Sequence, residues 1–292
     1  MTALRTATEI ASLSLQPPSS PPTIQLQSTE HRLALLAPLF SSSTLKPGAK
    51  ILEIGCGQGD ASAVLAELVG EGGHVTGVDP GPLDYGDPYT LGEAQAHLVA
   101  GPLGPRLTFV QADPIAFLES SPTTYDAVVL VLCLWYFPSP QVIRDTLAAA
   151  ARRAPTVFVA EWALEGPEGQ SAHVLAALAQ AALEAHSPSP SSNIRIAVSP
   201  AKIRQLAKEA GMKVEKEATV KAGETVLDGK WEVGEVLGEE FVERINDLVK
   251  GEKERDAVLA LRDATVASVK RVGGGKAVKS MDVYCATLVK AE

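Results

Sequence analysis

The chain has 292 residues, of which 46% are hydrophobic, and a formal net charge of −9. This length and apolar content suit one large α/β domain with insertions, and the acidic balance disfavours a nucleic-acid substrate. No apolar run reaches the roughly 18–20 residues that span a membrane. The three cysteines, Cys56, Cys133 and Cys285, form no CxxC pair. Their spacing argues against a disulfide framework or a zinc site and suits the cytoplasm.

The first 26 residues are rich in serine, threonine and proline, a composition that buries too little apolar area to order itself. We therefore predict a flexible tail over residues 1–26 and a globular domain over residues 27–292. The domain is expected to begin with a helix at 27–40, because Leu33, Leu36 and Leu39 then share one face.

Five predicted strands alternate with helices through the middle of the chain. The strands are expected at 50–55, 74–79, 106–113, 125–135 and 156–164, and the helices between them at 60–69, 94–99, 115–118 and 141–152. Such alternation requires parallel strands joined by right-handed crossovers, which predicts a Rossmann-like, doubly wound α/β sheet.

The alternation loosens after the fifth strand. The remaining pieces are expected as helices at 171–185 and 200–210, a sixth strand at 212–220 and a closing strand at 277–289. Two segments, about 165–195 and 222–275, are predicted as helical cap or lid insertions. The charge runs of the second are typical of a solvated helix face. We expect this insertion to act as a lid or as a dimer contact, in a monomer or a homodimer.

The most specific motif is ILEIGCGQGD, in which a buried strand runs into Gly55, Gly57 and Gly59 and then into a helix. Glycine lets the backbone turn tightly and approach a ligand closely at the carboxyl end of a strand. A dinucleotide fingerprint needs glycine at position 60, where this chain has Asp60, and this disfavours NAD or FAD. An ordinary strand-to-helix turn is the structural alternative.

Two aspartates stand at the ends of the next strands. Asp79 ends HVTGVD, where a carboxylate can accept hydrogen bonds from two ribose hydroxyls. Asp113 ends LTFVQAD, where an oxygen can accept from an adenine amine. Each has a helix cap or turn as its alternative role. The three strand ends together favour a nucleotide-type cofactor.

The segments ILEIGCGQG, VTGVD, VQAD and YDAVVLVLCLW together resemble class I S-adenosylmethionine-dependent methyltransferases. A wider pattern that includes STEHRLALL, AEWAL, SNIR and LDGKWEVG resembles fungal small-molecule methyltransferase-like proteins. The resemblance covers about residues 28–220 and the last strand. It implies a seven-stranded, mostly parallel sheet with an antiparallel last strand, and S-adenosylmethionine as the cofactor.

The resemblance also implies which residues bind the cofactor. Glu53 would help to hold the methionine amino group, Asp79 the ribose and Asp113 the adenine. Leu132 and Cys133 would flank the methionine part. The implied set is Glu53, Gly55, Cys56, Gly57, Gly59, Asp79, Pro80, Asp113, Pro114, Leu132 and Cys133.

Candidates for the acceptor side lie beyond the strand ends, because loops there line the sites of such folds. The predicted substrate-binding residues are Tyr85, Tyr89, Trp135, Trp162 and Arg195. For the two tryptophans, packing at the edge of the core is an equally good interpretation.

Three side chains are candidates for catalysis, namely Glu161, His31 and Tyr136. Glu161 could be a base, a clamp for a substrate amine, or a partner for Arg195. His31 could contact the methionine carboxylate, act as a base, or be a surface histidine. No cluster has the spacing of a metal site, so we expect a reaction without a metal.

The leading functional prediction is methyl transfer from S-adenosylmethionine to a small organic acceptor at oxygen, nitrogen or carbon. The cofactor supplies an electrophilic methyl group, while the protein aligns the nucleophile and excludes water. The alternative is a methyltransferase-like protein that binds the cofactor without methyl transfer, for regulation or for another reaction. We expect no nucleic-acid or membrane partner.

Overall fold

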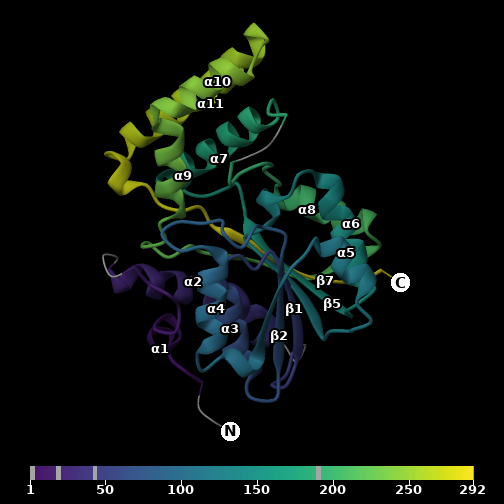
Figure 1. Ribbon diagram of the computed structural model, residues 1–292. Helices are drawn as coiled ribbons and strands as arrows, with labels where there is room; N and C mark the ends of the chain where they lie inside the picture. The colour runs from purple at the N-terminus through teal and green to yellow at the C-terminus, as the bar shows by residue number, and fades with distance from the viewer. Residues whose placement is uncertain (1–3, 18–20, 42–44, 189–191, 292) are drawn as a thin grey trace.

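A seven-stranded mixed sheet forms the centre of the computed structural model, which describes residues 4–17, 21–41, 45–188 and 192–291 (Figure 1). The strands are β1 (Lys50–Ile54), β2 (His74–Asp79), β3 (Leu107–Gln111), β4 (Ala127–Val131), β5 (Thr156–Trp162), β6 (Met212–Val220) and β7 (Val283–Lys290). Their order across the sheet is β3-β2-β1-β4-β5-β7-β6. The first five strands are parallel, and β7 is antiparallel to both of its neighbours. The predicted sheet, with its antiparallel last strand, is confirmed.

Helices cover both faces of the sheet. The helices that pack on it are α2 (Pro22–Ser41), α3 (Asp60–Val69), α4 (Leu91–Ala100), α5 (Pro114–Ser120), α6 (Pro140–Ala151) and α8 (Pro200–Glu209). Figure 1 shows α2, α3 and α4 on one side and α5, α6 and α8 on the other. Burial on both faces explains why β4 is a continuous apolar run. Among the described residues, no helix combines the length and the apolar character needed to cross a bilayer.

The strand order fixes where a ligand site can form. The chain leaves β1 toward one edge of the sheet and returns to β4 on the other side of β1, so the order reverses between these neighbours. Ligands of open α/β sheets bind beside the carboxyl ends of the strands at such a reversal. Residues that directly follow β1 and β4 therefore lie together at the carboxyl edge.

The remaining long helices form a second hydrophobic cluster. We call α7 (Ser171–Glu184), α9 (Asp228–Leu237), α10 (Glu239–Leu248) and α11 (Glu252–Arg271) the helical cap. Phe241 and Ile245 are fully buried in its core, which is separate from that of the sheet. The two predicted insertions thus combine into one unit, and Figure 1 shows α10 and α11 projecting beyond the sheet. The predicted insertion at about 222–275 contains α9, although no boundaries for this helix were predicted.

The helical cap is anchored at the carboxyl edge of the sheet. The first residue of β7, Val283, pairs with the last residue of β5, Trp162. The segment just before β7 therefore lies beside the carboxyl ends of the parallel strands. There the Gly229 N–H of α9 donates to the Ser280 hydroxyl, with 2.9 Å between nitrogen and oxygen.

The amino-terminal segment contains a helix where a flexible tail was predicted. Helix α1 (Ala7–Ala11) starts with a capping box, and its Ile10 side chain is buried in the main core. The Arg5 guanidinium forms a 2.6 Å ion pair with the Glu67 carboxylate of α3. Helix α2 also begins before residue 27. Two parts of the segment predicted as a tail, Ala7–Ala11 and the start of α2, are therefore helical in the structure. A short capped helix gains its stability from tertiary contacts that average composition does not reveal.

Candidate cofactor and acceptor site

The glycine loop after β1 has three residues in left-handed backbone conformations. The φ angles are 73° at Gly55, 51° at Gly57 and 95° at Gly59. A Cβ at Gly55 would lie 2.6 Å from the Cβ of Cys133, and one at Gly59 would lie 2.7 Å from Leu98 Cδ1. Around Gly57, apart from the residue itself and its two chain neighbours, no described heavy atom lies within 4 Å of the Cβ position. Gly55 and Gly59 therefore serve packing, whereas Gly57 faces open space at the carboxyl edge.

Asp79 ties this loop to the end of β2. One carboxylate oxygen accepts from the Gly57 N–H at 2.9 Å, and the other accepts from the Gly81 N–H at 2.8 Å. The Gln95 side chain of α4 donates to the Gly57 carbonyl at 2.7 Å. Because a carboxylate oxygen can accept more than one hydrogen bond, Asp79 retains acceptor capacity beside the loop.

Glu53, the acidic residue just before the loop, is buried and accepts a hydrogen bond from the Ser62 hydroxyl of α3. Burial raises the pKa of Glu53 to about 8, although this hydrogen bond and the positive charge of Arg32 oppose the shift. The carboxyl group is thus mostly protonated at neutral pH without a ligand. A cationic group beside it would favour ionisation.

The residues expected around adenine and methionine lie at the ends of β3 and β4. Asp113 is exposed and caps α5 by accepting from the Ala116 N–H at 2.9 Å, and Pro114 starts that helix. Leu132 has a φ of 51°, which is strained for a leucine. The Cys133 thiol is buried against the glycine loop and donates to the Ile54 carbonyl, just before that loop, at 3.3 Å. Of the other predicted contacts, Cys56 is buried and Pro80 is exposed.

Glu161 joins the carboxyl ends of β4 and β5. Its side chain is fully buried, one oxygen accepts from the Leu134 N–H at 2.8 Å, and the other accepts from the Trp162 N–H at 2.9 Å. Burial raises its pKa to about 7 against the effect of these backbone hydrogen bonds. The Arg195 backbone N–H donates to the Trp135 carbonyl at 2.9 Å, so this arginine lies beside the same loop.

His31 is buried, so the surface alternative for this residue is wrong. Only 4% of it is exposed, and its ring lies 5.7 Å from the Trp162 ring, centroid to centroid. Its Nδ1 atom is 3.3 Å from Nη1 of Arg32. Burial, and then the Arg32 charge, lower the pKa of His31 to about 3. The imidazole is therefore neutral at physiological pH.

The predicted tyrosines lie nearer the surface. Tyr85 and Tyr136 are about half exposed, and the Tyr85 hydroxyl donates to the Asn193 side-chain oxygen at 3.4 Å. Partial burial, then the nearby carboxylates of Glu232 and Asp228, raise the pKa of Tyr136. Tyr89 is half-buried at the end of the same polar stretch as Tyr85.

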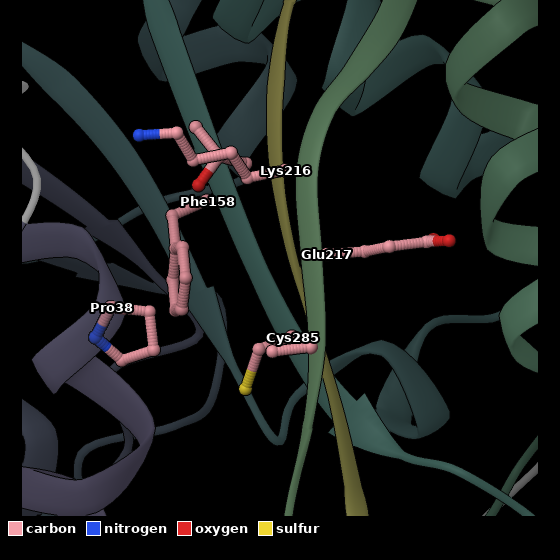
Figure 2. A pocket seen from close by; sticks show the side chains of 7 residues that line it. Pro38, Phe158, Lys216, Glu217 and Cys285 are labelled. Carbon is pink, nitrogen blue, oxygen red and sulfur yellow. The ribbon is translucent and has the colours of Figure 1, made fainter.

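Two surface hollows flank β6, away from the predicted cofactor residues. The first has a volume of about 460 Å³ and is lined by Pro38, Phe158, Lys216, Glu217, Ala218, Cys285 and Thr287. Figure 2 shows Lys216 and Glu217 pointing to opposite sides of this strand. The second has a volume of about 540 Å³, and Arg204 and Tyr284 contribute to its lining. Within the described part of the chain, no group of acidic, histidine and cysteine residues could hold a metal ion.

Comparison with known proteins assigns the family. A family model described as a methyltransferase domain matches residues 51–154. The chain is 34% identical over 282 residues to methyltransferase phomM' of Diaporthe leptostromiformis, with 82% of this chain and 72% of the relative covered. The chain belongs to the class I S-adenosylmethionine-dependent methyltransferases. It is also similar to a cyclopropane-fatty-acyl-phospholipid synthase-like protein from Lactobacillus casei ATCC 334, with 35% identity, a TM-score of 0.83, and 97% and 98% of the two chains covered.

The cofactor of this methyltransferase is S-adenosylmethionine. The magnesium protoporphyrin IX methyltransferase of Synechocystis PCC 6803, solved with bound S-adenosylhomocysteine, shares the fold at a TM-score of 0.51 and 14% identity, over 98% and 93% of the two chains. The residues present fit such a group, because the backbone at Gly57 faces open space beside the Asp79 carboxylate, which keeps acceptor capacity. When bound, the cofactor supplies a methyl group that a nucleophile can attack.

Sequence reasoning missed several side chains that shape the site. Ser62 is the hydrogen-bond partner of Glu53, Arg32 is the cation nearest His31, and Gln95 holds the glycine loop. His173 of α7 is fully buried against Trp162, with 5.1 Å between ring centroids. An alanine-rich helix gives no signal in the sequence that His173 packs on a strand end far away in the chain.

Proposed function

We propose that this methyltransferase acts on a small organic acceptor, at an oxygen, nitrogen or carbon atom, beneath the helical cap. The observation that carries the proposal is Gly57. It has a left-handed backbone at the carboxyl edge, it is held by the Asp79 carboxylate, and its Cβ position faces open space, with no described heavy atom beyond its chain neighbours within 4 Å. A close backbone approach to the methionine and ribose parts of the cofactor explains all three features.

Within this proposal the cofactor-binding residues keep the roles that the resemblance implies. Glu53 would take the methionine ammonium, Asp79 the ribose hydroxyls, and Asp113 with Pro114 would border the adenine. Leu132 and Cys133 would flank the methionine part. The strained backbone of Leu132 supports a functional position, since such strain concentrates at binding sites.

The proposed catalytic roles become more specific. Both oxygens of Glu161 hold backbone N–H groups, which supports positioning of the loop after β4 in preference to proton abstraction. An arginine can only donate, so the His31 nitrogen near Arg32 is the acceptor, and the other ring nitrogen carries the proton. His31 would thus donate a hydrogen bond, for example to the methionine carboxylate. Tyr136, Tyr85, Tyr89 and Arg195 would line the acceptor entrance with the helical cap as a lid.

Trp135 and Trp162 would contact the acceptor from the ends of the fourth and fifth strands. Both are largely buried, so they also belong to the edge of the core. We further propose a cytoplasmic location, which the three separate buried cysteines support.

Labelled S-adenosylmethionine and a panel of small oxygen, nitrogen and carbon acceptors test the proposal. We expect S-adenosylhomocysteine to bind in calorimetry and label to move to one acceptor class. Absence of binding would contradict the cofactor site. Binding without transfer to any acceptor would favour the alternative of a cofactor-binding protein.

A further inference from the structure

Three buried aromatic rings meet at the carboxyl end of β5. Trp162 ends that strand, His31 comes from α2, and His173 comes from α7 of the helical cap. The Trp162 ring lies 5.7 Å from the His31 ring and 5.1 Å from the His173 ring, and the second contact is edge-on. At most 6% of any of the three residues is exposed. Packing of the core alone does not explain why two imidazole rings lie here. The hydrogen bonds of each ring therefore indicate its role.

The tautomer of His173 follows from its one backbone contact. The Met281 N–H donates to Nδ1 of His173, with 3.0 Å between the nitrogens. Burial lowers the pKa of His173 to about 3, so the ring is neutral at physiological pH. In a neutral imidazole whose Nδ1 accepts, Nε2 carries the hydrogen. His173 therefore presents an Nε2–H donor, and this atom has no hydrogen-bond partner among the described residues.

Other buried donors near the ends of β4 and β5 also lack a hydrogen-bond partner in the part of the chain that the structure describes. Buried nitrogens of His31, Trp135 and Arg195 also find no partner within the described ranges. Trp135 and Trp162 belong to the same region because Glu161 accepts from the backbone of Leu134, next to Trp135, and from that of Trp162. Buried N–H groups are normally paired. One acceptor that is unpartnered in the described structure, Oε1 of Gln170, lies one turn before His173 in the chain. The N–H donors themselves are satisfied by oxygen acceptors and cannot be satisfied by an ammonium group or by hydrocarbon.

We propose that His173 binds the methyl acceptor by donating its Nε2–H to an oxygen atom of that molecule. The acceptor class is then a compound with a carbonyl, carboxylate or hydroxyl oxygen beside Trp162. The inference rests on the proposed function, since it assumes that a methyl acceptor binds at the carboxyl end of β5.

His173 lies on the helical cap and outside the matched methyltransferase domain of residues 51–154, which favours the acceptor over the cofactor as its ligand. The residue is a binding and positioning residue and not a base, because Nδ1 is already occupied and Nε2 has no free lone pair.

Matched small probes and two substitutions test this assignment. The protein saturated with S-adenosylhomocysteine is titrated with benzoate and benzamide, which offer oxygen acceptors, and with benzylamine, which at neutral pH does not. His173→Phe keeps a ring against Trp162 and removes the donor. His173→Gln keeps both an acceptor for Met281 and a donor. His74→Gln, at the start of β2 where its ring contacts Thr108, is the control for losing a histidine elsewhere.

We expect benzoate or benzamide to shift the His173 Nε2 resonance in nitrogen-15 spectra, and benzylamine to leave it unchanged. His173→Phe should weaken the binding of that probe at least about tenfold, the loss expected for one well-formed hydrogen bond. His173→Gln should retain most of the wild-type affinity, and His74→Gln should match wild type. Equal affinity in His173→Phe, or no response to either oxygen probe, would overturn the inference and leave a buried water as the partner of Nε2. Failure of S-adenosylhomocysteine to bind the wild type would instead contradict the proposed function.

Discussion

Replacing Gly57 with alanine tests the cofactor site most directly, because the structure separates the effect of the change on folding from its effect on cofactor binding. The residue has a φ of 51°, which alanine tolerates at a cost of about 1–2 kcal/mol. Beyond the two chain neighbours, no described heavy atom lies within 4 Å of the new methyl group, so we expect no clash with the rest of the protein. For a protein of this size, each kcal/mol lowers the melting temperature by about 2–4 °C.

The same methyl group would occupy the space that the cofactor is expected to fill. We therefore expect Gly57→Ala to fold and to bind S-adenosylhomocysteine at least about tenfold more weakly, a loss of about 1.4 kcal/mol, in isothermal calorimetry. Gly211→Ala is the matched control, because Gly211 has a φ of 76° and open space around its Cβ position but lies between α8 and β6. If Gly57→Ala folds and binds like wild type and Gly211→Ala, the cofactor does not pass over this loop.

Three further outcomes are expected. Binding of S-adenosylhomocysteine should tighten from about pH 6 to 7.5 and release protons at pH 7 in calorimetry. The reason is that Glu53, with a pKa of about 8, must ionise to hold an ammonium group. Glu53→Gln should lose this pH dependence. Glu161→Gln should lower the free energy of unfolding by about 1–3 kcal/mol in urea titrations, since one buried N–H loses its charged acceptor. Lost turnover with unchanged stability would instead identify Glu161 as a base. Above pH 6.5 His173 is neutral in both the folded and the unfolded chain. As pH falls from 6.5 toward 3, the unfolded chain binds a proton at His173 and the folded protein does not, so the fold loses stability. The stability advantage of wild type over His173→Gln should therefore shrink by about 1.4 kcal/mol for each pH unit below 6.5, and a constant difference would refute a buried neutral ring.

Local patterns in the sequence predict the sheet and the cofactor loop. Alternating apolar strands and helices require parallel pairing, and glycines at alternate positions after β1 require a tight turn there. The position of Asp79 beside the glycine loop follows from its place at the end of β2 alone. These features depend on neighbours close in sequence or on rules of strand connection, so the chain order is enough to find them.

Tertiary packing decided the features that depend on residues distant in sequence. Helix α1 is stabilised by an ion pair to α3, and the two insertions merge into one helical cap through a shared apolar cluster. Glu161 proved to be a buried acceptor for backbone N–H groups, and burial of His31 and His173 against Trp162 made both imidazoles neutral donors. Burial and hydrogen-bond partners set the protonation of a side chain, and neither can be read from the residues beside it in the chain. The sequence determined that the protein binds S-adenosylmethionine, whereas the inference that its acceptor carries an oxygen came only from the folded arrangement.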